Sequence, residues 1–97
     1  MMVVLEVIDK SGRKIYLTDE RWKHILKHPE MQDKQAIERI KESLVKPLKV
    51  VDVDEDVKYY YKYYKNMKSK AKYLRTIVKY LNGEGFVISS YFIEKMP

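Results

Sequence analysis

The chain of 97 residues contains no cysteine, which excludes disulfide bonds, thiolate nucleophiles and cysteine-bound metals. No apolar run approaches the length that spans a bilayer, and the apolar segment 1–9 is too short and too lightly charged for a signal peptide. Repeats, linkers and low-complexity segments are also lacking. These absences predict one folded domain, residues 1–97, in the cytoplasm.

Positive charge is unevenly distributed along the sequence. Residues 1–56 carry 11 Lys and Arg against 12 Asp and Glu, whereas residues 57–97 carry 9 against 2. No acidic residue lies between Val57 and Leu81. A surface of one sign raises the local concentration of polyanions such as RNA. The alternative is a solvated face that only keeps the protein soluble.

The amino-acid pattern predicts an α+β fold. Strands are expected where β-branched and aromatic residues cluster or alternate, at residues 2–8, 14–17, 48–53, 57–64, 73–81 and 85–93. Thr18 and Asp33 are suited to cap two helices, which should end near Lys27 and Pro47. The first two strands would form a hairpin. The order β-β-α-α-β-β-β-β favours a four-stranded antiparallel sheet with two helices packed on one face.

One flank of the first expected helix carries Arg21, His24 and His28, at the border between its apolar face and solvent. The two histidines, four residues apart, could chelate one metal ion, but no clear third ligand accompanies them. Alternatively, a histidine could act as general acid or base while Arg21 stabilises negative charge. On the helix alone, the structural interpretation is favoured: His28 interacts with the helix dipole and His24 is a half-buried surface residue.

Tyrosine dominates the strand at 57–64. Strand alternation places Tyr59, Tyr61 and Tyr63 on one face, and Tyr60, Lys62 and Tyr64 on the other. Lysines interleaved with aromatic rings suit single-stranded nucleic acid, because lysines contact phosphates while rings stack on bases. Tyrosine is also simply a good strand residue that pairs well across a sheet. The sequence leaves both interpretations open.

The last two strands add further candidates. Arg75 and Lys79 share one strand face, as two cations suited to phosphate, and Ser89 shares a face with Tyr91. The sequence contains no Gly-rich phosphate loop, no Ser-His-Asp order and no paired-carboxylate site.

Several segments together resemble a known family. They are IYLTDERWKHI at 15–25, HPE at 28–30, YYKYY at 60–64, YLRTIVK at 73–79 and FVISSYF at 86–92. In this order they are similar to small phage- and mobile-element-associated proteins of the barnase–EndoU–colicin–RelE-like nuclease superfamily. The resemblance spans residues 13–95. It implies helices followed by a four-stranded antiparallel sheet, which the periodicity favours independently.

The resemblance also implies metal-independent RNA cleavage on the sheet face, without a cofactor and often restrained by an antitoxin-like protein partner. Such cleavage needs a base, an acid and cations around the phosphate. Carried over by position, the expected catalytic residues are His24, Arg21, Lys62, Lys79 and Ser89. The expected RNA-binding residues are Tyr61, Tyr63, Lys72 and Arg75. The family often has threonine where Ser89 stands.

Two other functions are compatible with the same residues. One is an RNA-binding module without catalysis, built on the tyrosine- and lysine-rich surface. The other is a protein-interaction domain derived from a toxin, which would expose a hydrophobic patch and bind nucleic acid weakly.

Overall fold

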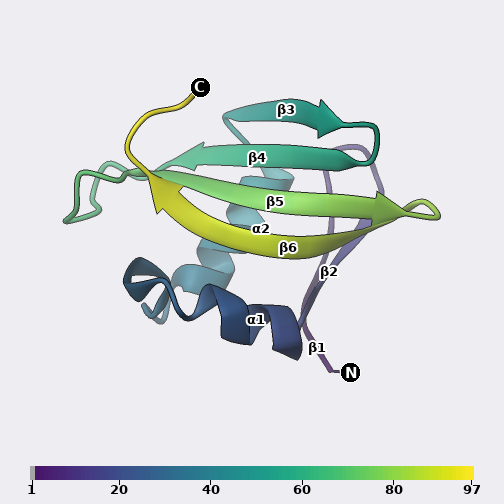
Figure 1. Cartoon of the computed structure of the whole chain (residues 1–97), viewed down its shortest axis with the longest axis horizontal. Helices are drawn as coiled ribbons and strands as arrows, with labels where there is room; N and C mark the ends of the chain where they lie inside the picture. Colours follow the sequence, from purple (N-terminus) through teal and green to yellow (C-terminus); the bar gives the residue numbers. More distant parts are fainter. Residues whose placement is uncertain (1) are drawn as a thin grey trace.

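The computed structural model describes residues 2–97, and within them it has the expected α+β class and element order (Figure 1). The elements are β1 Val3–Ile8, β2 Lys14–Thr18, α1 Asp19–Ile25, the 3₁₀ turn η1 Pro29–Met31, α2 Ala36–Val45, β3 Lys49–Asp54, β4 Val57–Tyr63, β5 Tyr73–Leu81 and β6 Glu84–Ile93. Thr18 caps α1 as predicted, because its hydroxyl accepts a hydrogen bond from the Arg21 amide. No helix in this part of the chain is long and apolar enough to cross a membrane.

The sheet differs from the expected four-stranded antiparallel one. All six strands join one mixed sheet in the order β1-β2-β6-β5-β4-β3. The first hairpin attaches through parallel pairing of β2 with β6, at Ile15 with Gly85 and at Tyr16 with Phe86. The prediction was wrong here because alternation identifies strands but does not say which strands become neighbours. This parallel pair joins two segments between which both helices and three strands lie along the chain.

Both helices contribute side chains to a single core. Ile25 of α1 and Ile40 and Leu44 of α2 are fully buried in it. Figure 1 shows α2 crossing behind the central strands. α1 lies along the part of β6 that does not pair with β2. We call the sheet face turned toward α2 the inner face and the opposite one the outer face. Neither helix covers the outer face.

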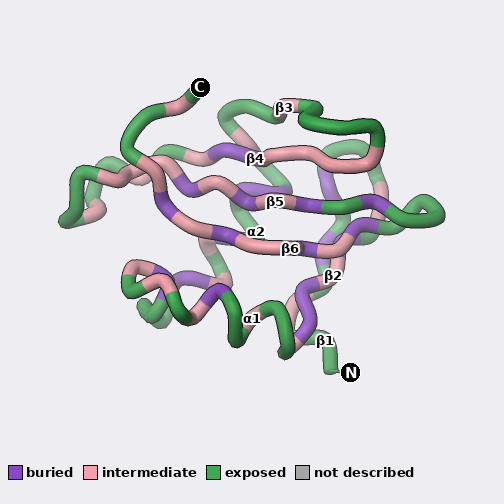
Figure 2. The backbone as a smooth tube through the Cα atoms, viewed as in Figure 1, coloured by how far each residue is buried: buried purple, intermediate pink, exposed green. Residues whose placement is uncertain are grey.

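Strand β5 shows how the two faces differ (Figure 2). Its inner-face residues Leu74, Thr76 and Val78 are fully buried, and the residues between them are partly exposed or exposed. Thr76 is satisfied within the core by a chain of hydroxyls, with Ser43 of α2 on one side and Ser90 of β6 on the other, each at 2.9 Å. These bonds fix the position of α2 on the sheet because buried hydroxyls need partners.

A buried carboxylate connects the first hairpin to the central strands. Asp9 accepts hydrogen bonds from the amides of Ser11 and Arg13, both at 2.9 Å, and so closes the turn after β1. Its other oxygen accepts from the hydroxyls of Tyr80, at 2.6 Å, and Tyr60, at 3.3 Å. Burial raises the pKa of Asp9, but the hydrogen bonds from the Ser11 and Tyr80 hydroxyls and from the Arg13 and Ser11 amides outweigh burial and hold the pKa below its ordinary value.

The first prediction concerns the charge of Asp9. Asp9→Asn should lower the free energy of unfolding at pH 7 by about 1–3 kcal/mol, because charge-assisted hydrogen bonds are lost in a buried site. Because the folded pKa is lowered, the contribution of the carboxylate is complete above the unfolded pKa of about 3.9 and is lost as the pH falls through the folded pKa. The difference between wild type and variant in urea unfolding should therefore shrink at acidic pH.

The exposed Glu55→Gln is the control for that experiment and should change stability little at either pH. A difference between Asp9→Asn and wild type that persists unchanged in strong acid would contradict the assigned role of the Asp9 carboxylate.

The second prediction concerns Gly85, at the parallel contact of β2 and β6. A Cβ atom there would lie 2.9 Å from the Tyr80 ring, 2.9 Å from Val78 Cγ1 and 3.0 Å from Ile15 Cγ1. Gly85→Ala should therefore destabilise the fold by about 1–3 kcal/mol in thermal or urea unfolding. The control Ser89→Ala, on the same strand, should have a smaller effect. Equal stability of Gly85→Ala and wild type would show that the two strands are packed less tightly.

Candidate nucleic-acid interface

The outer face of the sheet gathers most of the aromatic residues that the sequence singled out. The register aligns Tyr61, Arg75 and Tyr91 across β4, β5 and β6, and pairs Tyr63 with Tyr73. We call this outer surface the tyrosine face. Its tyrosines are Tyr59, Tyr61, Tyr63, Tyr73 and Tyr91. The inner tyrosines Tyr60 and Tyr64 instead bond to Asp9 and Glu42, so the structure separates the two sets.

Arg75 occupies the middle of the tyrosine face. It donates from Nε to the Tyr61 hydroxyl at 3.0 Å and from Nη1 to the Tyr91 hydroxyl at 3.2 Å. Its guanidinium carbon lies 5.0 Å from the centroid of the Tyr59 ring, a distance typical of a cation–π contact. Partial burial lowers the pKa of Arg75, but the hydrogen bonds to Tyr91 and Tyr61 raise it by more. The group therefore stays charged.

No carboxylate neutralises this arginine within residues 2–97. The ion pairs of that range join Arg13 to Asp9, Arg39 to Asp33 and Lys58 to Asp52. A guanidinium has five N–H donors, and the two tyrosine hydroxyls leave others available. Arg75 is thus a cation fixed in position by neutral groups on a partly exposed face. Such a group is suited to bind an anion with two parallel hydrogen bonds.

Aromatic rings continue on either side of Arg75. The Tyr63 and Tyr73 rings lie 5.0 Å apart, and Tyr63 is 46% exposed. On the other side, the His28 ring lies 5.3 Å from the Tyr91 ring. The sequence indicated His28 as a helix-end residue, and nothing in the pattern indicated its contact with the last strand. That contact depends on how the chain turns between α1 and η1.

The predicted catalytic residues are only partly brought together. Lys79 and Ser89 lie on the outer face with Arg75, because they continue the register of β5 and β6. Lys62 lies on the inner face, where its ammonium donates to the Lys46 carbonyl at 2.8 Å at the end of α2. It therefore cannot share a site with Lys79. Lys72 donates to the Met67 carbonyl and holds the β4–β5 loop.

His24 and Arg21 are exposed on α1, and neither side chain hydrogen bonds to the sheet within residues 2–97. His24 lines a shallow hollow of about 140 Å³ with Glu20, Lys23 and Lys27. α1 ends at Ile25 and His28 has an extended backbone, so the contact of His28 with Tyr91 does not extend to His24 and Arg21. The sequence indicated one flank with all three residues, but of the three His28 makes the contact with the tyrosine face.

Across residues 2–97, no three His, Asp or Glu side chains are clustered so that they could hold a metal ion. Comparisons of the chain with protein-family models, with curated proteins and with solved structures find no match. Membership of the nuclease superfamily therefore stays a prediction based on the segments quoted above.

The third prediction tests how Arg75 is held. Tyr61 is fully buried, and Tyr61→Phe would remove the acceptor of the Arg75 Nε hydrogen bond. We expect a loss of about 1 kcal/mol in urea unfolding. Tyr63→Phe is the matched control, because the Tyr63 hydroxyl has no hydrogen-bond partner within residues 2–97 and its removal should have almost no effect. A similar loss in both variants would mean that the Tyr61 hydroxyl does not hold Arg75.

Proposed function

We propose that the protein binds single-stranded RNA on the tyrosine face and cleaves it without a metal ion at a phosphate held by Arg75. The observation that carries this proposal is the placement of Arg75, which is held by two tyrosine hydroxyls and lacks an acidic partner within residues 2–97. A diester phosphate presents two non-bridging oxygens to the remaining donors of the guanidinium.

The surroundings of Arg75 suit a single strand better than a duplex. Tyr63, Tyr73 and Tyr59 offer ring faces on which unpaired bases can stack, whereas duplex bases are already stacked on each other. Lys79 is exposed on the same face and can contact a further phosphate. All tyrosines of the tyrosine face except Tyr91 lie in the segment 57–81, as do Arg75 and Lys79. This segment has no acidic residue, so a polyanion meets little repulsion there.

Cleavage would follow the usual route for metal-independent RNA cleavage, an internal transesterification. The 2′-hydroxyl loses its proton to a base and attacks phosphorus, and the 5′-oxygen leaves with a proton from an acid. The products are a 2′,3′-cyclic phosphate and a 5′-hydroxyl end. Arg75 would stabilise the extra negative charge of the pentavalent phosphate. His28, against Tyr91, and His24, on α1, are the candidates for proton transfer because an imidazole can accept a proton at one nitrogen and donate one from the other.

The second candidate is an RNA-binding module that does not cleave. Two observations favour it: both groups that Arg75 bonds are tyrosines, and His24 is exposed on α1 with no hydrogen bond to the sheet in the described part of the chain. In this case the tyrosines and cations of the outer face alone would determine affinity.

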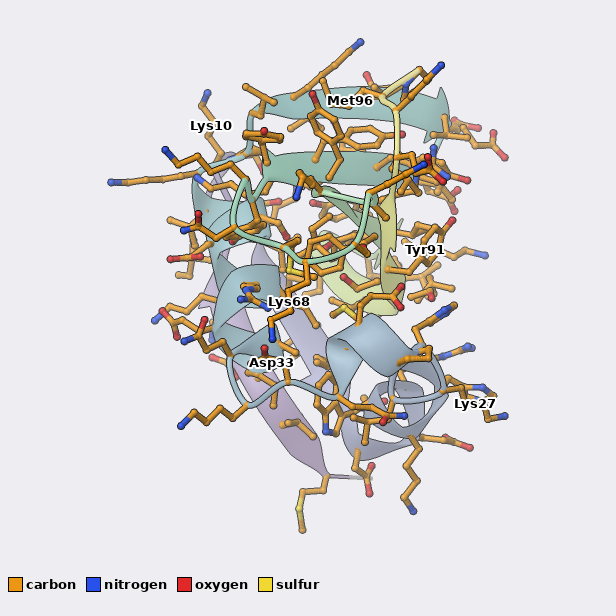
Figure 3. The ribbon with its side chains drawn as sticks, turned by 90° about the vertical axis from the view of Figure 1, so that its left-hand side faces the viewer. Lys10, Lys27, Asp33, Lys68, Tyr91 and Met96 are labelled. Carbon is orange, nitrogen blue, oxygen red and sulfur yellow. The ribbon has the colours of Figure 1, made fainter. Side chains whose placement is uncertain are left out.

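The fourth prediction tests both candidates with a labelled single-stranded RNA, in the presence of a chelator. Arg75→Ala should lower the rate of cleavage by about 100-fold or more, as loss of one transition-state donor does in other enzymes. Arg75→Lys should recover little, since an ammonium cannot make two parallel bonds. His28→Ala and His24→Ala show which histidine transfers the proton. Lys10→Ala, an exposed cation on the opposite side from Tyr91 in Figure 3, should leave the rate unchanged.

The outcomes separate the candidates. Cyclic-phosphate ends that disappear in Arg75→Ala support the enzyme. Salt-dependent binding that needs Arg75, without any new ends, selects the binding module. Binding and cleavage both absent in wild type would overturn the proposal and favour a protein-interaction domain.

A further inference from the structure

A hollow of about 630 Å³ opens at the end of β4, between α2 and the loop that leads to β5. Figure 3 looks onto this end of the molecule, with the loop that carries Lys68 toward the viewer and Tyr91 at the outer face to the right. The volume lies within the usual range of small-molecule sites. Its lining combines aromatic rings, Tyr63 and Tyr64, with the polar side chains of Gln35, Glu38 and Lys65.

Tyr63 connects this hollow to the tyrosine face. Its ring packs against Tyr73 on the outer face, and the residue also lines the hollow. Along β4 it lies two residues from Tyr61, whose hydroxyl holds Arg75. Two strand residues span about 7 Å. When one phosphate of an RNA strand is bound at Arg75, a neighbouring nucleotide of that RNA therefore reaches the hollow.

Some of the polar groups around the hollow already have partners. The Tyr64 hydroxyl donates to Glu42 at 2.6 Å, and Arg39 donates to Gln35 at 3.1 Å. Glu38 is different, because its exposed carboxylate forms no hydrogen bond or ion pair within residues 2–97. A carboxylate is acceptor-only and can accept two parallel hydrogen bonds. The hollow thus offers aromatic rings and, in Glu38, a carboxylate acceptor without a partner within residues 2–97.

We propose that this hollow binds one unpaired base of the RNA strand, stacked on Tyr63 with its donor edge toward Glu38. The inference rests on the proposed function. Guanine fits best, because its N1–H and N2–H are two adjacent donors on one edge. Adenine, cytosine and uracil each present a single donor group on their Watson–Crick edge. Lys65 at the rim can contact the phosphate of the same nucleotide.

Charge makes this a selective site and not a general one. An unpaired carboxylate repels the phosphate backbone, so Glu38 lowers affinity for any strand whose base does not pair with it. A base with two donors offsets this repulsion with charge-assisted hydrogen bonds, whereas a base with one donor offsets it less. Glu38 therefore discriminates between bases, while Arg75 and Lys65 bind any strand.

The fifth prediction uses short oligouridylates with one guanosine, adenosine or cytidine, with non-hydrolysable 2′-methoxy groups, in fluorescence anisotropy. The guanosine strand should bind wild type at least about tenfold more tightly than the others, as expected for a bidentate base contact. In Glu38→Gln the preference should fall to about twofold or less. Glu20→Gln removes the same charge on α1 and should keep the tenfold preference. Tyr63→Ala should weaken binding of the guanosine strand more than binding of the other strands.

Failure of this inference differs from failure of the proposed function. If Arg75→Ala weakens all strands but wild type has no base preference, or Glu38→Gln retains it, the base site is overturned and the RNA-binding face stands. If Arg75→Ala changes nothing, the proposed function itself is wrong. Circular dichroism checks that each variant is folded, and because Glu38 is exposed its replacement should not perturb the fold.

Discussion

The buried hydrogen bonds of Asp9 are the constraint on which the assembly of the sheet depends. The first hairpin pairs with β6 at only two positions, so the parallel contact alone gives it little support. Asp9 adds bonds to tyrosines of β4 and β5, and Arg13 packs over the Tyr80 ring at 3.6 Å. The carboxylate thus holds three segments distant in sequence, at a site where an unpaired charge would cost several kcal/mol.

The tyrosines have two physical roles. The two roles belong to opposite faces of the sheet, because successive side chains of a strand alternate between the faces. On the inner face their hydroxyls satisfy Asp9 and Glu42 while their rings fill the core. On the outer face their hydroxyls and rings surround Arg75. This arrangement keeps a cation partly buried without an acidic partner in the described residues, which leaves its remaining donors for an anion. A carboxylate in place of Tyr61 or Tyr91 would neutralise the site.

The sheet edges are less suited to binding than its outer face. Both edge strands, β1 and β3, have irregular register, after Val3 and after Asp52, and β3 exposes Lys49, Asp52 and Asp54. Bulges and charges at edges oppose the addition of another strand. The tyrosine face and the hollow at its end are not restricted in this way. They adjoin at Tyr63, so one extended ligand could occupy both.

The sequence by itself determined the elements: six strands, two helices and the Thr18 cap. Local periodicity and turn chemistry suffice for these. It also placed Arg75 and Lys79 on one face, because alternation within a strand is local. Only the tertiary structure decided that β2 pairs with β6, that Lys62 faces α2, and that His28 contacts Tyr91. These depend on hydrogen bonding and packing between segments far apart in the chain, which a local pattern does not encode.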